Sequence, residues 1–172
     1  MPIKRIYHII DYYPDLATYF GILIISILEL LIGNNLKVLI FSIFMMFFTF
    51  LIVLPTNIAL KNLFKTKRPD GYRNNKISHF KGSFPSFHTQ FSFGVSTAFI
   101  TAIYLLSPDN IKLLATLLAI FCLEGMSVIV GYSRIVVNAH YPKDVVGGAV
   151  FGIITGFICS YTLTPILKDL IV

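Results

Sequence analysis

The sequence predicts an all-α protein that crosses a membrane several times, and two observations carry this prediction. Of its 172 residues, 56% are hydrophobic and only 13% are charged, whereas a soluble domain has about 45–50% apolar and about 25% charged residues. The apolar residues are also gathered into runs of the length that a helix needs to cross the hydrocarbon core, which is about 20 residues. We therefore expect one membrane-embedded domain over residues 1–172, built as a polytopic helix bundle.

Five apolar segments are long enough to span the membrane as helices. In chain order they are Leu16–Ile32, Leu36–Leu60, Thr89–Leu106, Ile111–Val130 and Val145–Leu167.

Two further features modify this outline. Pro55 falls inside the second segment and should kink it. Ahead of the first segment, isoleucines and a tyrosine between Ile3 and Ile10 give the chain an apolar face, so this stretch is either an interfacial helix or a frayed terminus. It lacks the uninterrupted apolar region and small-residue cleavage site of a removable signal peptide.

The connections between the segments are unequal. Gly33–Asn35 and Ser107–Asn110 are tight turns, so the helices that flank each turn should be antiparallel neighbours. The connections over residues 61–88 and 133–144 are longer and polar. Counting the crossings places both polar connections, and the N-terminal segment, on the same side of the membrane.

Charge and cysteine usage exclude several classes of function. The net charge is +6, which in a soluble protein would suggest nucleic acid as a partner. Here the basic residues cluster between Lys61 and Lys81 beside apolar runs, so we expect anionic lipid or phosphate and no nucleic acid. Cys122 and Cys159 lie inside apolar segments and are predicted to be small hydrophobic residues rather than disulfide or metal ligands.

The polar connections carry residues that suit a phosphoryl group. Lys61, Arg68 and Arg134 are cations, of which the arginines offer a planar fork that matches phosphate oxygens and the lysine a compact charge. Ser86 adds a hydroxyl just before the third segment, where the amides and dipole of a helix N-terminus favour an anion.

Two histidines and an aspartate complete the predicted site. His140 and Asp144 flank Pro142, so that Asp144 can reach back to one imidazole nitrogen, fix the tautomer and leave the other nitrogen to attack phosphorus. His88 is the candidate proton donor for the leaving oxygen. The only acids near the site are Asp70 and Asp144, too few for a magnesium site, so we expect no metal and no other cofactor.

These residues form a pattern that resembles a known family. Lys61-x6-Arg68-Pro69, Pro85-Ser86-x-His88 and Ser133-Arg134-x5-His140-x3-Asp144 resemble the three-part signature of the type 2 phosphatidic acid phosphatase (PAP2) superfamily. That superfamily contains membrane lipid phosphatases and vanadium haloperoxidases. The resemblance implies a phosphohistidine on His140, orientation by Asp144 and acid catalysis by His88. It also implies phosphate binding by Lys61, Arg68, Ser86, the amide of Phe87 and Arg134.

The chain departs from the family pattern in two places. Phe87 stands where the family usually has glycine. Its backbone N–H is retained, but phenylalanine would be strained in a backbone conformation that only glycine adopts. The phenylalanine ring could also face lipid. Many members have six spanning helices, whereas five segments are predicted here.

Other polar residues are expected to lie outside the chemistry. Glu124 falls inside the fourth segment, about two turns from Ser133, and we expect a structural role there, while Asn57 stays open between structure and function. The remaining residues are expected to be solvated, in contact with lipid head groups or part of the loop structure: Lys65, Lys67, Asp70, Arg73, Lys76, His79 and Lys81.

Membrane orientation receives opposing indications. The side with the two polar connections carries most of the basic residues, namely Lys4, Arg5, Lys61, Lys65, Lys67, Arg68, Arg73, Lys76, Lys81, Arg134 and Lys143. The other side carries Lys37, Lys112 and Lys168. This bias alone places the site in the cytoplasm, whereas the resemblance implies the outer face. Because phosphate itself requires three of the cations, we expect an inner-membrane protein with its site on the periplasmic face.

The expected substrate is a phosphorylated membrane lipid, because the site lies at helix ends, level with lipid head groups. By resemblance, lipid A 1-phosphate ranks first. Phosphatidylglycerophosphate and undecaprenyl pyrophosphate, with broad specificity, are alternatives. A lipid transporter or flippase and a non-catalytic lipid-binding protein are hypotheses from other classes. The oligomeric state is left open.

Overall fold

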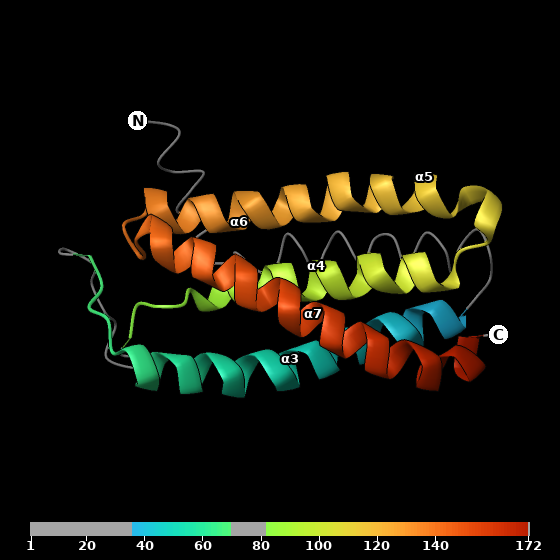
Figure 1. The fold of residues 1–172 in the computed structure, drawn as a ribbon, viewed down its shortest axis with the longest axis horizontal. Coiled ribbons are helices and arrows are strands. Elements are labelled where there is room, and N and C mark those ends of the chain that lie inside the picture. Colours follow the sequence, from blue (N-terminus) through green and yellow to red (C-terminus); the bar gives the residue numbers. More distant parts are fainter. Residues whose placement is uncertain (1–35, 70–81, 172) are drawn as a thin grey trace.

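The computed structural model describes residues 36–69 and 82–171, and every regular element in that part is a helix. The helices are α3 (Leu36–Phe64), α4 (Phe87–Leu106), α5 (Asp109–Ala119), the π-helix η1 (Ile120–Glu124), α6 (Gly125–Val136) and α7 (Pro142–Ile171). Because α5, η1 and α6 follow one another without a break, they form a single rod (Figure 1). The all-α prediction is confirmed.

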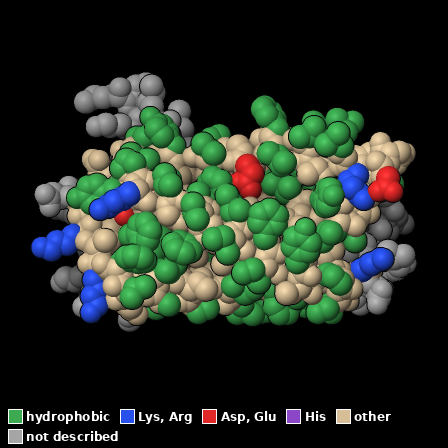
Figure 2. Space-filling model, in the orientation of Figure 1, with side chains coloured by type: hydrophobic (Ala, Val, Ile, Leu, Met, Phe, Trp, Pro, Cys, Tyr) green, Lys and Arg blue, Asp and Glu red, His purple; other side chains and the backbone are tan. Residues whose placement is uncertain are grey.

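Within the described residues, four helical stretches are long and apolar enough to cross a membrane. They are Ile40–Phe64, Phe87–Leu106, Asp109–Val136 and Pro142–Lys168. Apolar side chains cover the face seen in Figure 2, and lysines and arginines lie towards its two ends. The four stretches correspond to the last four predicted segments. The predicted Leu16–Ile32 segment and the N-terminal interfacial stretch lie outside the described residues.

Several predicted helix ends were wrong. Helix α3 continues through Pro55 and past Leu60 to Phe64, so Lys61 lies in its last turn rather than at the start of a loop. A cation is favourable there because it faces the negative end of the helix dipole. Helix α4 begins at Phe87 rather than Thr89, which places His88 in its first turn. Helix α7 begins at Pro142, a residue suited to a first helical turn.

Helix α4 is the centre of the bundle, in contact with every other described helix. Its closest packing is against α7, where a Cβ on Gly152 would lie 2.4 Å from the Gln90 carbonyl oxygen and one on Gly156 2.5 Å from the Gly94 carbonyl oxygen. A Cβ on Gly148 would lie 2.8 Å from the Ser86 carbonyl oxygen. These three glycines lie at four-residue steps along α7, and small residues at that spacing allow two helices to approach closely.

Four helix ends meet at one end of the bundle (Figure 1). There α3 and α6 end, and α4 and α7 begin. The segments of chain that carry the predicted site residues are therefore neighbours in space, although they are far apart in the sequence.

Candidate active site

The backbone of His140 is positioned by the way in which α6 ends. Asn138 has a φ of 55°, the left-handed conformation that often terminates helices and that asparagine tolerates. The N–H groups of Ala139 and His140 then both donate to the Arg134 carbonyl oxygen, at 3.0 and 3.2 Å. This closed turn holds His140 just before α7 begins.

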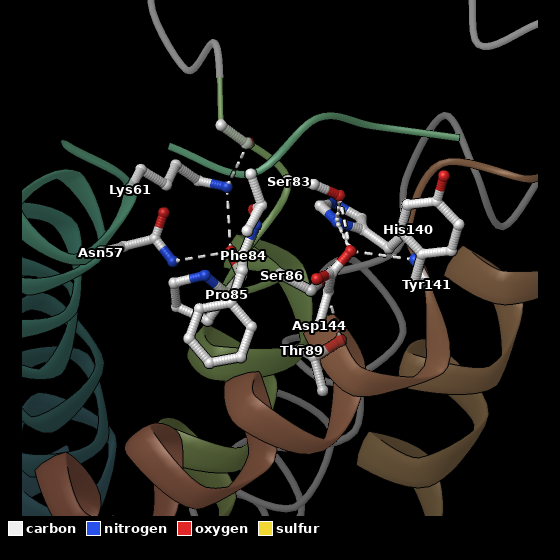
Figure 3. Close-up of polar contacts among 12 residues, drawn as sticks. Asn57, Lys61, Ser83, Phe84, Pro85, Ser86, Thr89, His140, Tyr141 and Asp144 are labelled. Carbon is white, nitrogen blue, oxygen red and sulfur yellow. Dashed lines mark hydrogen bonds and ion pairs between the residues drawn. The ribbon is translucent and has the colours of Figure 1, made fainter. Parts of the chain in front are cut away.

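Asp144 lies in the first turn of α7 and stabilises that turn. The Tyr141 N–H donates to Asp144 Oδ2 at 2.9 Å, and the Asp144 N–H donates to the Tyr141 carbonyl oxygen at 2.9 Å. This reciprocal pair resembles a capping box, and the carboxylate lies at the favourable end of the helix dipole. The same Oδ2 lies 3.6 Å from His140 Nδ1 (Figure 3), so the structure brings the predicted pair together.

Ser83 is a site residue that was not predicted. Its Oγ donates to Asp144 Oδ2 at 2.5 Å and lies 3.3 Å from His140 Nδ1 (Figure 3). It is fully buried. The only signal in the sequence was its place just ahead of the Pro85–His88 motif, because its partners come from the connection between α6 and α7.

Lys61 is buried, and its ammonium group binds the segment that leads into α4. Its Nζ donates to the carbonyl oxygens of Gly82 and Pro85, both at 2.9 Å. Two of the three ammonium protons therefore hold this segment against the end of α3. Lys61, predicted as a phosphate ligand, thus also shapes the loop on which Ser83 lies.

Asn57, one turn before Lys61, has a structural role that the sequence left open. Its Nδ2 donates to Gln90 Oε1 at 2.7 Å and to the Pro85 carbonyl oxygen at 3.3 Å. The Gln90 amide in turn donates to Thr56 Oγ1 at 3.2 Å. Asn57 and Gln90 are fully buried, so this network fixes the start of α4 against α3 from beneath the site.

Ser86 and Phe87 occupy the beginning of α4. Ser86 is fully buried; its N–H donates to the Asp144 carbonyl oxygen at 2.9 Å, and its Oγ accepts a 3.0 Å hydrogen bond from Thr89 Oγ1. Lys65 and Asn138 are the only non-glycine residues with positive φ in the described part of the chain, so the backbone strain expected at Phe87 is absent. Position 87 is ordinary helix, which accepts a side chain.

The Phe87 ring packs inside the bundle instead of projecting freely into lipid. It stacks on Phe91, with ring centroids 5.9 Å apart, and meets Phe50 of α3 edge-on at 6.5 Å. Because the ring is partly buried against the core, the phenylalanine that replaces the family's glycine joins α4 to α3.

The remaining predicted site residues also come from these helix ends. Arg134 is buried at the end of α6, where Nε and Nη2 of its guanidinium both donate to Ser133 Oγ at 3.1 Å. Arg68 follows α3 and is half-buried, and His88 is half-buried in the first turn of α4. His88 meets the Phe87 ring edge-on at 5.9 Å.

His140 is set up as a neutral imidazole. Burial lowers its pKa to about 4, and the positive charges of Arg68 and Lys61 act in the same direction, against the opposing hydrogen bond and charge of Asp144. At pH 7 the ring is therefore uncharged. With Nδ1 facing Asp144 and Ser83, Nε2 is the nitrogen with a lone pair available for a ligand.

Other polar residues fall where the sequence placed them or outside the described residues. Lys65 and Lys67 are exposed. Glu124 Oε1 accepts a 2.9 Å hydrogen bond from Thr97 Oγ1 in the middle of a span, as suits the structural role that we expected. Among the described residues, no group of three or more histidine, cysteine, aspartate or glutamate residues could hold a metal ion. Of the loop residues that were expected to lie outside the chemistry, the following are also outside the described part of the chain: Asp70, Arg73, Lys76, His79 and Lys81.

Comparison with known proteins gives one match. The family model described as the PAP2 superfamily matches residues 35–167, which is more than half of the chain and includes every residue of the candidate site. No curated protein and no solved structure matches the chain.

Proposed function

The chain belongs to the PAP2 superfamily, and this membership implies phosphatase activity on phosphate esters. We propose that it removes phosphate from a membrane lipid through a phosphohistidine on His140. The reaction needs no metal ion. The observation that carries the proposal is the neutral, buried imidazole of His140 beside Asp144, within the electrostatic influence of Lys61 and Arg68.

In the first step, His140 Nε2 attacks the phosphorus atom. The new N–P bond forms as the ester P–O bond breaks, and the leaving oxygen takes a proton from His88 to become the free lipid alcohol. Lys61, Arg68 and Arg134 stabilise the negative charge on the transferring phosphoryl oxygens. The Ser86 hydroxyl and the amide of Phe87, at the N-terminus of α4, bind the same oxygens.

In the second step, water hydrolyses the phosphohistidine. A water oxygen attacks phosphorus, His88 accepts the water proton, and the N–P bond breaks. Inorganic phosphate leaves and His140 returns to its neutral form. One water molecule is consumed for each lipid phosphate cleaved, and Asp144 keeps the imidazole in a single orientation throughout.

Lipid is the favoured carrier of the phosphate because of the site's place in the bundle. The site lies where four helix ends meet, and the helices between the two ends are long and apolar enough to span a bilayer. Such a site is level with lipid head groups. Lipid A 1-phosphate is our first candidate, with phosphatidylglycerophosphate and undecaprenyl pyrophosphate as alternatives under broad specificity.

The test is release of inorganic phosphate by the purified protein from a panel of these lipid phosphates. We expect release from at least one lipid, complete loss in His140→Ala, and activity within about twofold of wild type in Lys65→Ala, which removes an exposed cation near the same helix end. A phosphorylated intermediate should be trapped on wild type and absent from His140→Ala.

Lipid binding without phosphate release would instead support a transporter or lipid-binding protein. Inhibition by EDTA that added metal reverses would contradict the metal-free reaction.

We further propose that the site faces the periplasm, and the turn before α5 can test this. Asp109 lies at the end of the bundle opposite the site. With Cys122 and Cys159 replaced by serine, Asp109→Cys should resist a membrane-impermeant thiol reagent in intact cells and react after permeabilisation. Reaction in intact cells would place the site in the cytoplasm.

A further inference from the structure

We infer that Ser83 is a positioning residue for the phosphoryl transfer proposed above, on which this inference rests. Its hydroxyl holds Asp144 and selects the tautomer of His140 that can attack phosphorus. Ser83 belongs to the segment before α4, whereas Asp144 and His140 come from the connection between α6 and α7. The contact joins the two halves of the site.

The hydrogen bonds of Asp144 are the first support. Asp144 is fully buried, and a buried carboxylate is costly unless donors stabilise it. Oδ2 receives the Ser83 hydroxyl at 2.5 Å and the Tyr141 N–H at 2.9 Å. Oδ1 is buried and has no hydrogen-bond partner among the residues that the structure describes. Among the described residues, the carboxylate is therefore held by the Ser83 hydroxyl and the Tyr141 N–H as well as by the imidazole.

The proton inventory around His140 Nδ1 is the second support. A serine hydroxyl has one proton, and that proton is committed to Asp144. Towards Nδ1, 3.3 Å away, Ser83 Oγ can act only as an acceptor. The other neighbour of Nδ1 is Asp144 Oδ2, also an acceptor. Both acceptors face the same nitrogen (Figure 3). That nitrogen must therefore carry the hydrogen, which leaves the lone pair on Nε2.

Ser83 is itself held in place by the last turn of α3 and by the segment that follows α3. Its N–H donates to the Thr66 carbonyl oxygen at 2.9 Å, and the N–H of Phe84 donates to Thr66 Oγ1 at 2.8 Å. The carbonyl oxygen of Gly82 accepts from Lys61. The hydroxyl thus has a fixed position from which to orient the Asp144–His140 pair.

The test compares three variants of Ser83 in the full-length protein. Ser83→Ala should lower kcat by about 10–100-fold, the usual scale for losing a group that orients a reacting one, with KM and inhibition by inorganic phosphate within about twofold of wild type. Ser83→Thr, which keeps the hydroxyl, should restore most of kcat. Ser83→Cys introduces a weak donor of similar size, and its kcat should be as low as that of Ser83→Ala. If Ser83→Ala does not fold, Ser83→Cys takes its place in the test.

A direct readout is the tautomer of His140, measured by nitrogen NMR on histidine-labelled protein, with His140→Asn to assign the signal. We expect a single Nδ1–H tautomer in wild type and a mixture in Ser83→Ala. Ser127→Ala is the matched control, because Ser127 is also fully buried with a bonded hydroxyl, between α6 and α4; its kcat and tautomer should equal those of wild type.

Failure of this inference can be told apart from failure of the proposed function. If wild type releases no phosphate from any lipid, the proposed function fails, and the tautomer measurement still decides on Ser83. If wild type is active and His140→Ala is inactive, an unchanged kcat and a single tautomer in Ser83→Ala overturn the role of Ser83 alone.

Discussion

The α4–α7 pair and the α5–η1–α6 rod are packed in opposite ways. In the most apolar stretch of α4, 61% of the residues are buried, whereas 17% are buried in that of the rod. Between α4 and α7 the backbones themselves touch at Gly152, whereas a Cβ on Gly125 of the rod would meet nothing within 4 Å. Within the part of the chain that the structure describes, protein therefore covers little of the rod's surface.

This difference shows where the precision of the site comes from. The N–H of Ser86 donates to the Asp144 carbonyl oxygen at 2.9 Å, at the beginning of both α4 and α7. The same interface that carries the glycine contacts therefore also sets the distance between the segments of Ser86 and Asp144. From the rod, the candidate site takes Arg134 and the turn that leads to His140.

The largest effect should follow a methyl group placed between α4 and α7. In Gly152→Ala the new Cβ would lie 2.4 Å from the Gln90 carbonyl oxygen and 2.8 Å from Phe93 Cβ, and a helix backbone cannot yield locally. We expect a loss of about 3 kcal/mol in the free energy of unfolding and a kcat lowered at least tenfold, because the helices that align the site move apart. Unfolding in detergent and phosphate release measure both. An unchanged melting temperature would show that the interface is looser than the structure indicates.

A smaller effect is expected where α4 meets α3. Phe87→Gly restores the family's residue, removes the ring contacts with Phe50 and Phe91 and introduces glycine into a first helical turn. We expect the free energy of unfolding to fall by about 2 kcal/mol. The kcat per folded molecule should stay within about threefold, since the backbone N–H is retained. A large drop in kcat with normal stability would instead give the ring a role in the reaction.

In the rod, Glu124→Gln should change little. Glutamine keeps an oxygen that can accept the hydrogen bond from Thr97 and replaces the other carboxyl oxygen with an amide group that does not ionise. We therefore expect a change of about 1 kcal/mol or less in the free energy of unfolding and kcat within twofold. Phosphate release from the same lipid by wild type and by Glu124→Gln measures the change in kcat. A tenfold loss would contradict the structural role and make Glu124 part of the function.

The smallest effect should come from Gly125→Ala, the counterpart of Gly152→Ala. Gly125 has ordinary helical angles, with φ −56° and ψ −45°, and its surroundings leave room for a methyl group. Alanine should therefore stabilise the protein by about 0.5 kcal/mol through helix propensity, seen as a slightly raised melting temperature. Destabilisation would mean that a partner outside the described residues packs against this point.

The sequence predicted the spans and the local parts of the site, and it failed where distant segments meet. Apolar runs suffice to locate helices in a membrane, but they stop at the first polar residue, which is why Lys61 was assigned to a loop. The pair of His140 and Asp144 is set by spacing within one turn and was predictable. Ser83 and the Asn57–Gln90 pair were not, because their partners lie on other helices.

The π-helix η1 has a consequence for how this chain tolerates insertions and deletions. A π-turn holds one residue more than an α-helical turn, so η1 accommodates one extra residue between Ala119 and Gly125. Deleting one residue from Ile120–Glu124 should therefore give an uninterrupted α-helix in which α5 and α6 keep nearly the same orientation relative to each other. Because α6 leads into the turn that positions His140, an α6 that keeps its orientation also keeps that turn in place. The extra residue of the rod therefore lies where its deletion should disturb the candidate site little.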